Sequence, residues 1–158
     1  MASLITTSIG ANVVSTLIGR QIMTHAISDA SGSIYNSIGD IFYYSNSIDK
    51  FLTELDIENR IKNMQLIITK FEDIKEDDSI NQCLEGIHDM IIRIREDLKQ
   101  INIKIEKHKN KYINKWRSLN IKDQMYNLKI HSLLLDKRYD FLVKTVNLSS
   151  CLLSSQKS

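Results

Sequence analysis

The 158-residue chain contains no proline and only five glycines. Average usage would predict about eight prolines in a chain of this length. Because proline removes a backbone donor and clashes with the preceding turn, long helices exclude it. The two shortages therefore favour an all-helical protein, and the length suits a single domain.

Long apolar runs and paired cysteines are also missing. The chain has no stretch of about 20 strongly apolar residues, which argues against a conventional membrane-spanning helix. Cys83 and Cys151 are too few for a disulfide framework or a cysteine metal site. We therefore expect a reducing, cytoplasmic location, with membrane association as the alternative. The N-terminus lacks the basic start and dense apolar core of a secretory signal.

The chain does contain a long heptad repeat of apolar residues, in alternating steps of four and three, which His108 and Tyr112 continue. This spacing keeps one stripe of a helix against a partner helix. It predicts a helix from Ser79, with Gln82 completing a capping box, to near Arg117. Such a helix has about 39 residues and spans some 58 Å at ~1.5 Å per residue. The apolar members are Ile80, Leu84, Ile87, Ile91, Ile94, Leu98, Ile101 and Ile105.

Four other helices are expected around this one. They run from about Ser3 to Ile27, Ile34 to Leu55, Ile57 to near Glu76 with Asp56 as N-cap, and Ile121 to Ser149. The turn residues 29–33 separate the first two. Short turns make sequence neighbours antiparallel, so the helix from Ile57 should line the first half of the long helix and the last helix its second half. The predicted fold is thus an all-α, antiparallel bundle of four to five helices in one domain (1–150), followed by a flexible tail (151–158).

Charge is unevenly distributed along the chain. The net charge is −1 over residues 1–53, −5 over 54–100 and +8 over 101–158. A basic, partly aromatic segment at the predicted tip of the last hairpin is a candidate contact for an anionic surface such as lipid headgroups. A solvated helix end is the simpler interpretation, and nucleic acid is the least favoured. The candidate residues are Lys109, Lys111, Lys115, Trp116, Arg117 and Lys122.

No residue cluster predicts a chemistry. Glu85 and His88 have the spacing of a di-iron carboxylate–histidine pair, but a second such pair is absent. His108 occupies a stripe position, where it acts either as a hydrogen-bonded core residue that sets register or as a pH switch. We predict no catalytic, cofactor-binding or metal-ligating residue and no enzyme activity. The biased composition, rich in isoleucine, lysine and asparagine, is typical of an AT-rich genome of a protist, a large DNA virus or a bacterium.

The N-terminal segment is unusual because Arg20 is its only charged residue before Asp29. Small residues along it would permit close helix approach. We expect the bundle core to bury this helix, since it would otherwise leave a large apolar patch. The alternative is that a second chain or a bilayer covers this helix. The candidate membrane or partner residues are Ile5, Ile9, Val13, Val14, Leu17 and Ile18.

The uncharged first helix, the segment Ser33-Ile34-Tyr35-Asn36-Ser37-Ile38 and the long amphipathic helix together resemble HeLo-like cell-death domains. The N-terminal four-helix bundle of the necroptosis-executioner pseudokinases has a similar layout. The resemblance covers about residues 3–147 as a pattern, without a motif that can be matched residue by residue. It implies a bundle that oligomerises and an N-terminal part that engages membranes.

Two functions follow as expectations. The first is a non-enzymatic, self-associating interaction module that acts through heptad-type helix packing. The second is a membrane-active, HeLo-like effector whose uncharged N-terminal helix engages lipid. The expected partners are protein first, an anionic membrane second, and no cofactor.

Overall fold

The computed structural model describes residues 3–42, 44–71, 78–110 and 119–155, without the side chains of residues 3–18 and 152–154. These residues form helices and no strands, so the all-α prediction is confirmed. The helices are α1 (Ser3–Ile41), α2 (Asn46–Leu55), α3 (Ile57–Lys70), α4 (Asp78–Lys109) and α5 (Lys122–Ser155).

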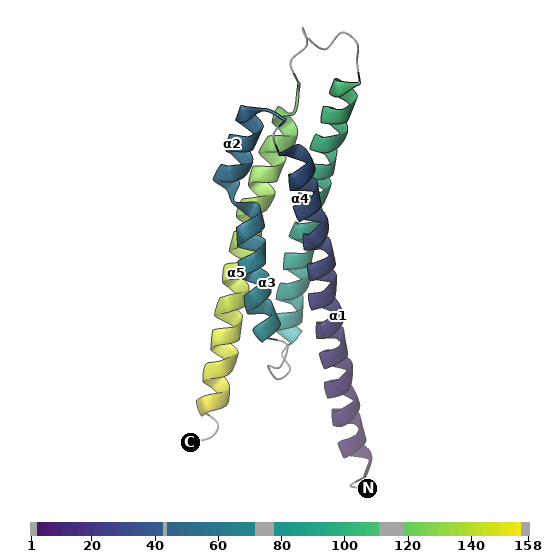
Figure 1. Cartoon of the computed structure of the whole chain (residues 1–158). Helices are drawn as coiled ribbons and strands as arrows, with labels where there is room; N and C mark the ends of the chain where they lie inside the picture. The colour runs from purple at the N-terminus through teal and green to yellow at the C-terminus, as the bar shows by residue number, and fades with distance from the viewer. Residues whose placement is uncertain (1–2, 43, 72–77, 111–118, 156–158) are drawn as a thin grey trace.

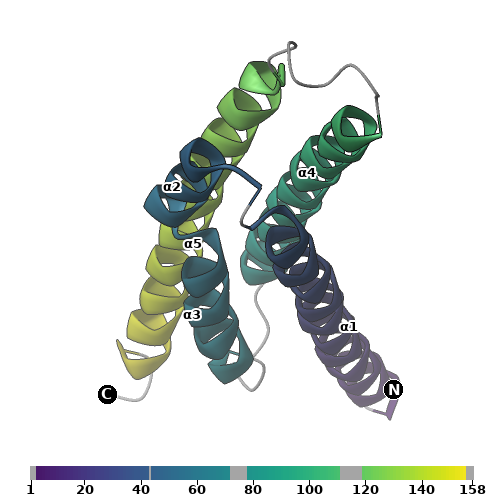
Figure 2. The ribbon, with the colours of Figure 1, turned by 45° about the horizontal axis from the view of Figure 1, so that its top comes forward.

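The helices form an up-and-down bundle (Figure 1). α1 runs up, α2 and α3 together return as one rod, α4 runs up again and α5 returns. Helices α1 and α4 consequently run in the same direction, side by side (Figures 1 and 2). α4 packs most extensively on α5 and α1, while α3 packs on α1.

Two predicted packing relations are therefore wrong. α3 does not line the first half of α4, because α1 occupies that flank and α3 packs on α1 instead. α5 is not confined to the second half of α4. It contacts α4 from Lys104, which donates to Gln124, down to Cys83, whose Sγ lies 3.8 Å from Thr145 Oγ1.

The predicted stripe of α4 is the centre of the core. All eight of its isoleucines and leucines are at most 1% exposed. Cys83 and Met90 widen the buried face on one side. The other helices supply matching buried residues, which are Ile57, Ile61, Met64 and Ile68 from α3 and Leu128, Ser132, Leu135, Leu142 and Val146 from α5, with Ile121 just before α5. The predicted α4 stripe is confirmed, and it is covered by the chain's own helices.

The predicted break at residues 29–33 is wrong, because α1 continues through it to Ile41. Ala30 and Ser31 are buried, and the Ser31 hydroxyl donates to the Ile27 carbonyl at 2.6 Å. Small residues here allow close packing, and this burial outweighs the weak helix propensity of serine and glycine. The chain turns later, and α2 begins after Ser45, whose hydroxyl accepts from the Ile48 amide.

Several predicted helix ends also move. Ser79 lies inside the first turn of α4, so it is not the N-cap. α4 is described over 32 residues to Lys109, and its predicted extension to Arg117 falls outside the described residues. α5 continues to Ser155, so residues 151–155 are helical where a tail was predicted.

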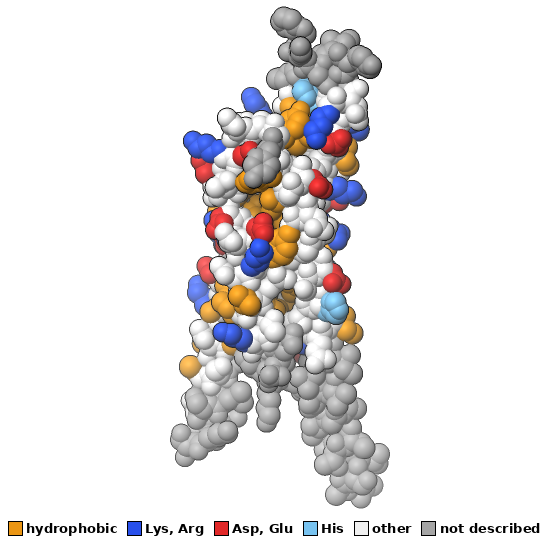
Figure 3. All heavy atoms as spheres, viewed as in Figure 1, with side chains coloured by type: hydrophobic (Ala, Val, Ile, Leu, Met, Phe, Trp, Pro, Cys, Tyr) orange, Lys and Arg blue, Asp and Glu red, His pale blue; other side chains and the backbone are white. Residues whose placement is uncertain are grey.

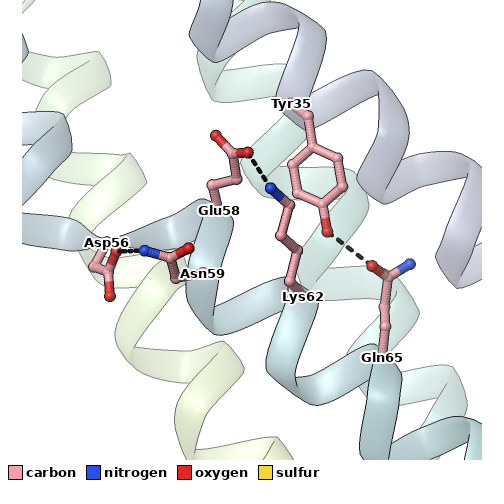
Figure 4. Close-up of polar contacts among 6 residues, drawn as sticks. All are labelled: Tyr35, Asp56, Glu58, Asn59, Lys62 and Gln65. Carbon is pink, nitrogen blue, oxygen red and sulfur yellow. Dashed lines mark hydrogen bonds and ion pairs between the residues drawn. The ribbon is translucent and has the colours of Figure 1, made fainter.

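Asp56 differs from its predicted role as a side-chain cap for α3. Its φ is 48°, in the left-handed region, and its amide bonds to carbonyls of α2 as a C-cap. Its carboxylate accepts from the Asn59 side-chain amide at 2.7 Å rather than from the α3 backbone (Figure 4). Asp56 therefore forms the kink that joins α2 and α3 into one rod.

Polar contacts tie α3 to α1 on the outer surface (Figure 4). The Tyr35 hydroxyl donates to Gln65 Oε1 at 2.7 Å, and the Lys62 ammonium lies 5.1 Å from the centre of the Tyr35 ring. Glu58 pairs with Lys62. Burial and the nearby Glu58 charge raise the pKa of Tyr35, so the phenol remains a neutral donor.

Candidate interaction surface

Arg20 is buried where three helices meet. It is 1% exposed, although it is the only charged residue in its region of α1. Its Nε donates to Asn81 Oδ1 at 3.3 Å, and its Nη1 donates to the Phe71 carbonyl at 3.4 Å. The guanidinium thus joins α1 to the end of α3 and the start of α4. The sequence analysis did not predict this role of Arg20. The signal that could have indicated it was a single charged residue in an otherwise apolar helix.

α1 extends well past this junction. Because Arg20 meets the ends of α3 and α4, residues 3–19 continue the helix about 26 Å beyond them, at ~1.5 Å per residue (Figure 1). The predicted burial of this segment stays a prediction, because the side chains concerned lie outside the described residues. Those side chains are Ile5, Ile9, Val13, Val14, Leu17 and Ile18.

The predicted basic tip is only partly described. Lys122 is exposed at the start of α5. The Lys109 ammonium pairs with Glu106 at 2.8 Å and lies 5.7 Å from the Tyr44 ring centre. The remaining candidates, Lys111, Lys115, Trp116 and Arg117, lie outside the described residues. The described residues therefore do not test an anionic contact here.

The histidines occupy ordinary structural positions. His108 is half-buried, and its Nδ1 lies 2.8 Å from the Tyr44 hydroxyl, which agrees with a hydrogen-bonded residue that sets register. Glu85 is exposed and His88 half-buried on α4. Among the described residues, no three His, Cys, Asp or Glu side chains gather closely enough to hold a metal ion.

A line of polar contacts runs along the boundary between α4 and α5. His131 Nδ1 lies 2.5 Å from Asp97 Oδ2, with both side chains mostly buried. Burial raises the pKa of Asp97, although its hydrogen bond with His131 and the charge of that imidazole act in the opposite direction. Below this pair, the Arg138 guanidinium donates to the Gly86 carbonyl. These contacts set the level of each helix relative to the other.

α5 also contacts α3 through an ion pair. Arg60 Nη1 lies 2.7 Å from Asp136 Oδ2 and 3.3 Å from the Ser132 hydroxyl. Burial raises the pKa of Asp136, the Arg60 charge lowers it, and the Asp140 charge raises it. Two faces of α5 are therefore used inside the molecule, one toward α4 and one toward α3.

A third face of α5 carries apolar residues that the chain does not cover. Leu134, Phe141 and Leu148, spaced by seven residues, are 38%, 63% and 67% exposed. We call these three residues the outer stripe. Their spacing places them on one line along the helix. The face seen in Figure 3 shows hydrophobic side chains in small groups between charged ones.

Leu134 and Phe141 of the outer stripe line one wall of a groove between α4 and α5. The groove has a volume of about 450 Å³. Gly86 lies against Arg138 in this groove, since a Cβ there would lie 3.4 Å from Arg138 Nη1, in van der Waals contact. The lining residues are Ser79, Gln82, Cys83 and Gly86 from α4 and Leu134, Lys137, Arg138 and Phe141 from α5.

Comparison with known proteins yields a viral relative. The chain is 32% identical over 148 residues to "Uncharacterized protein L717" of Acanthamoeba polyphaga mimivirus, a match that covers 75% of this chain and 72% of the relative. The chain belongs to the family of this mimivirus protein. The relative is therefore viral, and a virus was one of the three kinds of source expected from the composition of this chain.

Other comparisons add no assignment. No protein-family model and no solved structure matches the chain. The resemblance to HeLo-like domains therefore stays a prediction. Among the helices of the described residues, none combines the length and apolar content needed to cross a bilayer.

Proposed function

We propose that this protein is a non-enzymatic, self-associating helical module that binds other helices through the outer stripe of α5. The observation that supports this proposal is the exposed set Leu134, Phe141 and Leu148 at heptad spacing. Such spacing suits helix-on-helix packing, and aligned exposed apolar residues are characteristic of interaction surfaces.

The α4 stripe no longer supports assembly. Its eight isoleucines and leucines are buried within one molecule, where α4 packs on α1 and α5. The proposal therefore depends on α5, where two faces bind within the chain and the outer stripe remains exposed.

Sedimentation equilibrium tests the proposal. The wild-type protein should show a mass above the 18.3 kDa of one chain. Phe141→Asp should return it to the monomer, because a charge would replace the central apolar contact. Leu66→Asp is the matched control, since Leu66 is 66% exposed on α3 and should leave assembly unchanged. A wild-type protein that stays monomeric at high concentration, or a Phe141→Asp variant that assembles normally, would overturn the proposal.

A membrane-active effector is the second candidate, favoured by a separate observation. Residues 3–19 contain no charged side chain and extend α1 beyond the ends of α3 and α4. An uncharged helix end with small residues enters a bilayer at lower cost than a charged one.

Vesicle leakage tests this second candidate. Deletion of residues 1–18 keeps Arg20 and its contacts, so the bundle should still fold. Leakage of vesicles containing an anionic phospholipid should be lost in this variant and in Val14→Asp. Absence of leakage by the wild-type protein, or equal leakage by the deletion variant, would reject the membrane role.

A further inference from the structure

The α2–α3 rod meets the rest of the bundle differently from the other helices. α4 packs closely on both α1 and α5, so these three helices form a continuous layer with α4 in the middle. The rod lies across one face of this layer (Figures 1 and 2). It packs most closely on α1, and its approach to α4 and α5 is slighter. The edge of the rod next to α1 is therefore the more firmly held.

The α4 stripe lies beneath the rod. On α4, Asn81 and Asn102 contact α1, whereas Cys83 and Asp97 contact α5. At about 100° per residue, the stripe falls between these two sides of the helix and faces the interior of the bundle. The buried side chains of the rod belong to the same core as the stripe. They are Ile48, Leu52, Leu55, Ile57, Ile61, Met64 and Ile68.

A polar cluster holds the other edge of the rod to α5. Arg60 Nη1 of α3 donates to Asp136 Oδ2 at 2.7 Å and to the Ser132 hydroxyl at 3.3 Å. The side chains of Arg60 and Asp136 are 35% and 36% exposed, so water reaches this ion pair and weakens it. Because close packing is slighter here, the attachment of the rod to α5 depends on this cluster more than its attachment to α1 depends on polar contacts.

Asp56 joins α2 and α3 into a unit that moves together. Its amide donates to the carbonyls of Leu52 and Thr53 in α2, and its carboxylate accepts from Asn59 in α3. Hydrogen bonds therefore fix the kink on both sides. A motion that releases α3 from α5 carries α2 with it.

We propose that the α2–α3 rod is a lid that opens from α5 as one unit, while α1, α4 and α5 stay packed together. Arg60 is the latch of this lid, and the contact of the rod with α1 is its hinge side. Opening exposes the α4 stripe, which the closed molecule buries. Separate opening of the least tightly packed unit of a protein is a general property of native structures. The inference concerns the interior of one chain and does not depend on the proposed assembly.

Thiol labelling of the folded protein tests the opening. When a site closes faster than its thiol reacts, the labelling rate reports the fraction of time for which the site is open. Met64→Cys places a thiol on the inner face of α3, in a Cys151→Ser background. Cys83 stays as an internal reference on the side of α4 that contacts α5. Met64 and Cys83 are 6% and 7% exposed, so the closed molecule shields the two positions alike.

The rates of reaction with N-ethylmaleimide are followed by peptide mass spectrometry, and each is divided by the rate in the urea-unfolded protein. The thiol at position 64 should react at least about tenfold faster than Cys83. Leu52→Cys, at a buried position of α2, should react at the same rate as Met64→Cys because the rod opens as one unit. Equal rates at position 64 and Cys83, or different rates for the two thiols of the rod, would overturn the lid.

A variant within the layer distinguishes opening of the lid from unfolding of the whole chain. His131→Ala removes a contact between α4 and α5 that the open molecule keeps. It should lower the free energy of unfolding in urea and leave the labelling rate at position 64 unchanged. If only unfolding of the whole chain exposed that thiol, its rate would rise by the same factor as the unfolding equilibrium constant, and the proposal would be wrong.

Arg60→Met tests the latch. It should raise the labelling rate at position 64 about tenfold, since Asp136 loses a charge-assisted hydrogen bond in the closed state only. Lys50→Met is the matched control, because Lys50 is an exposed cation of the rod that pairs with Glu54 on α2 itself. This variant should leave the rate unchanged. An Arg60→Met rate no higher than that of the control would overturn the latch.

Discussion

The buried stripe of α4 and the outer stripe of α5 share a heptad spacing but have opposite environments. The residues of the α4 stripe are all buried, whereas Leu134, Phe141 and Leu148 are all exposed. The α4 stripe is covered because α1 and α5 flank the helix and the α2–α3 rod lies across the core. The comparison teaches that heptad spacing identifies a surface that packs and that the fold decides what it packs against.

The largest expected effect comes from the buried stripe. Ile91→Ala should lower the free energy of unfolding by about 2–5 kcal/mol, because it removes buried methyl groups and leaves a cavity. Ile91 is fully buried at the middle of α4. Urea unfolding measures the loss, with Leu66→Ala as an exposed control within ~0.5 kcal/mol of wild type. A loss as small as the control's would place the α4 stripe outside the core.

A substitution at Gly32 of α1 should produce a smaller change in the free energy of unfolding, with the opposite sign. Gly32→Ala should raise the free energy of unfolding by up to ~1 kcal/mol, since alanine favours a helix interior. A Cβ at Gly32 meets no atom within 4 Å. Thermal or urea unfolding checks this. A destabilised variant would favour the turn at residues 29–33 that the composition suggested.

The free energy of unfolding should depend on pH through Asp97, which contacts His131 at the boundary between α4 and α5. Because burial raises the pKa of Asp97, the folded state binds a proton there more readily than the unfolded state does. Its stabilising contribution is present below the unfolded pKa, near 3.9, and is lost as pH rises through the higher folded value. Wild type should therefore lose stability relative to Asp97→Asn from about pH 4 upward.

Urea unfolding of both proteins at stepped pH measures this difference. The same series in a His131→Gln background separates the imidazole from the carboxyl. A wild-type protein that gains stability over Asp97→Asn as pH rises would contradict the sign.

The smallest effect on stability should come from the outer stripe itself. Phe141→Ala should stay within about 0.5 kcal/mol of wild type at concentrations where both are monomeric, because the side chain is mostly exposed. Dilute-solution unfolding makes this measurement. A loss comparable to that of Ile91→Ala would mean that Phe141 belongs to the core, and the contrast between the two stripes would fail.

Much of the fold was predictable from local patterns. The stripe beginning at Ile80 predicted its helix and its buried face correctly, and the helices expected from Ile57 and Ile121 are present. The break near Gly32 was predicted wrongly, because turn residues in a long helix are tolerated when packing stabilises it. The outer stripe was missed because Leu133, Leu134 and Leu135 are adjacent, and their order does not show which of them faces inward.

The sequence by itself determined the class of the fold and the core faces, since both depend on missing proline and on spacing within one helix. Tertiary structure decided which helices became neighbours, because that depends on contacts distant in sequence. It brought Arg20 to Phe71 and Asn81, joined α2 to α3 at Asp56 and placed α1 beside α4. It also covered the α4 stripe with the chain's own helices and left Leu134, Phe141 and Leu148 exposed, because a helix in the bundle buries only the faces that its neighbours reach.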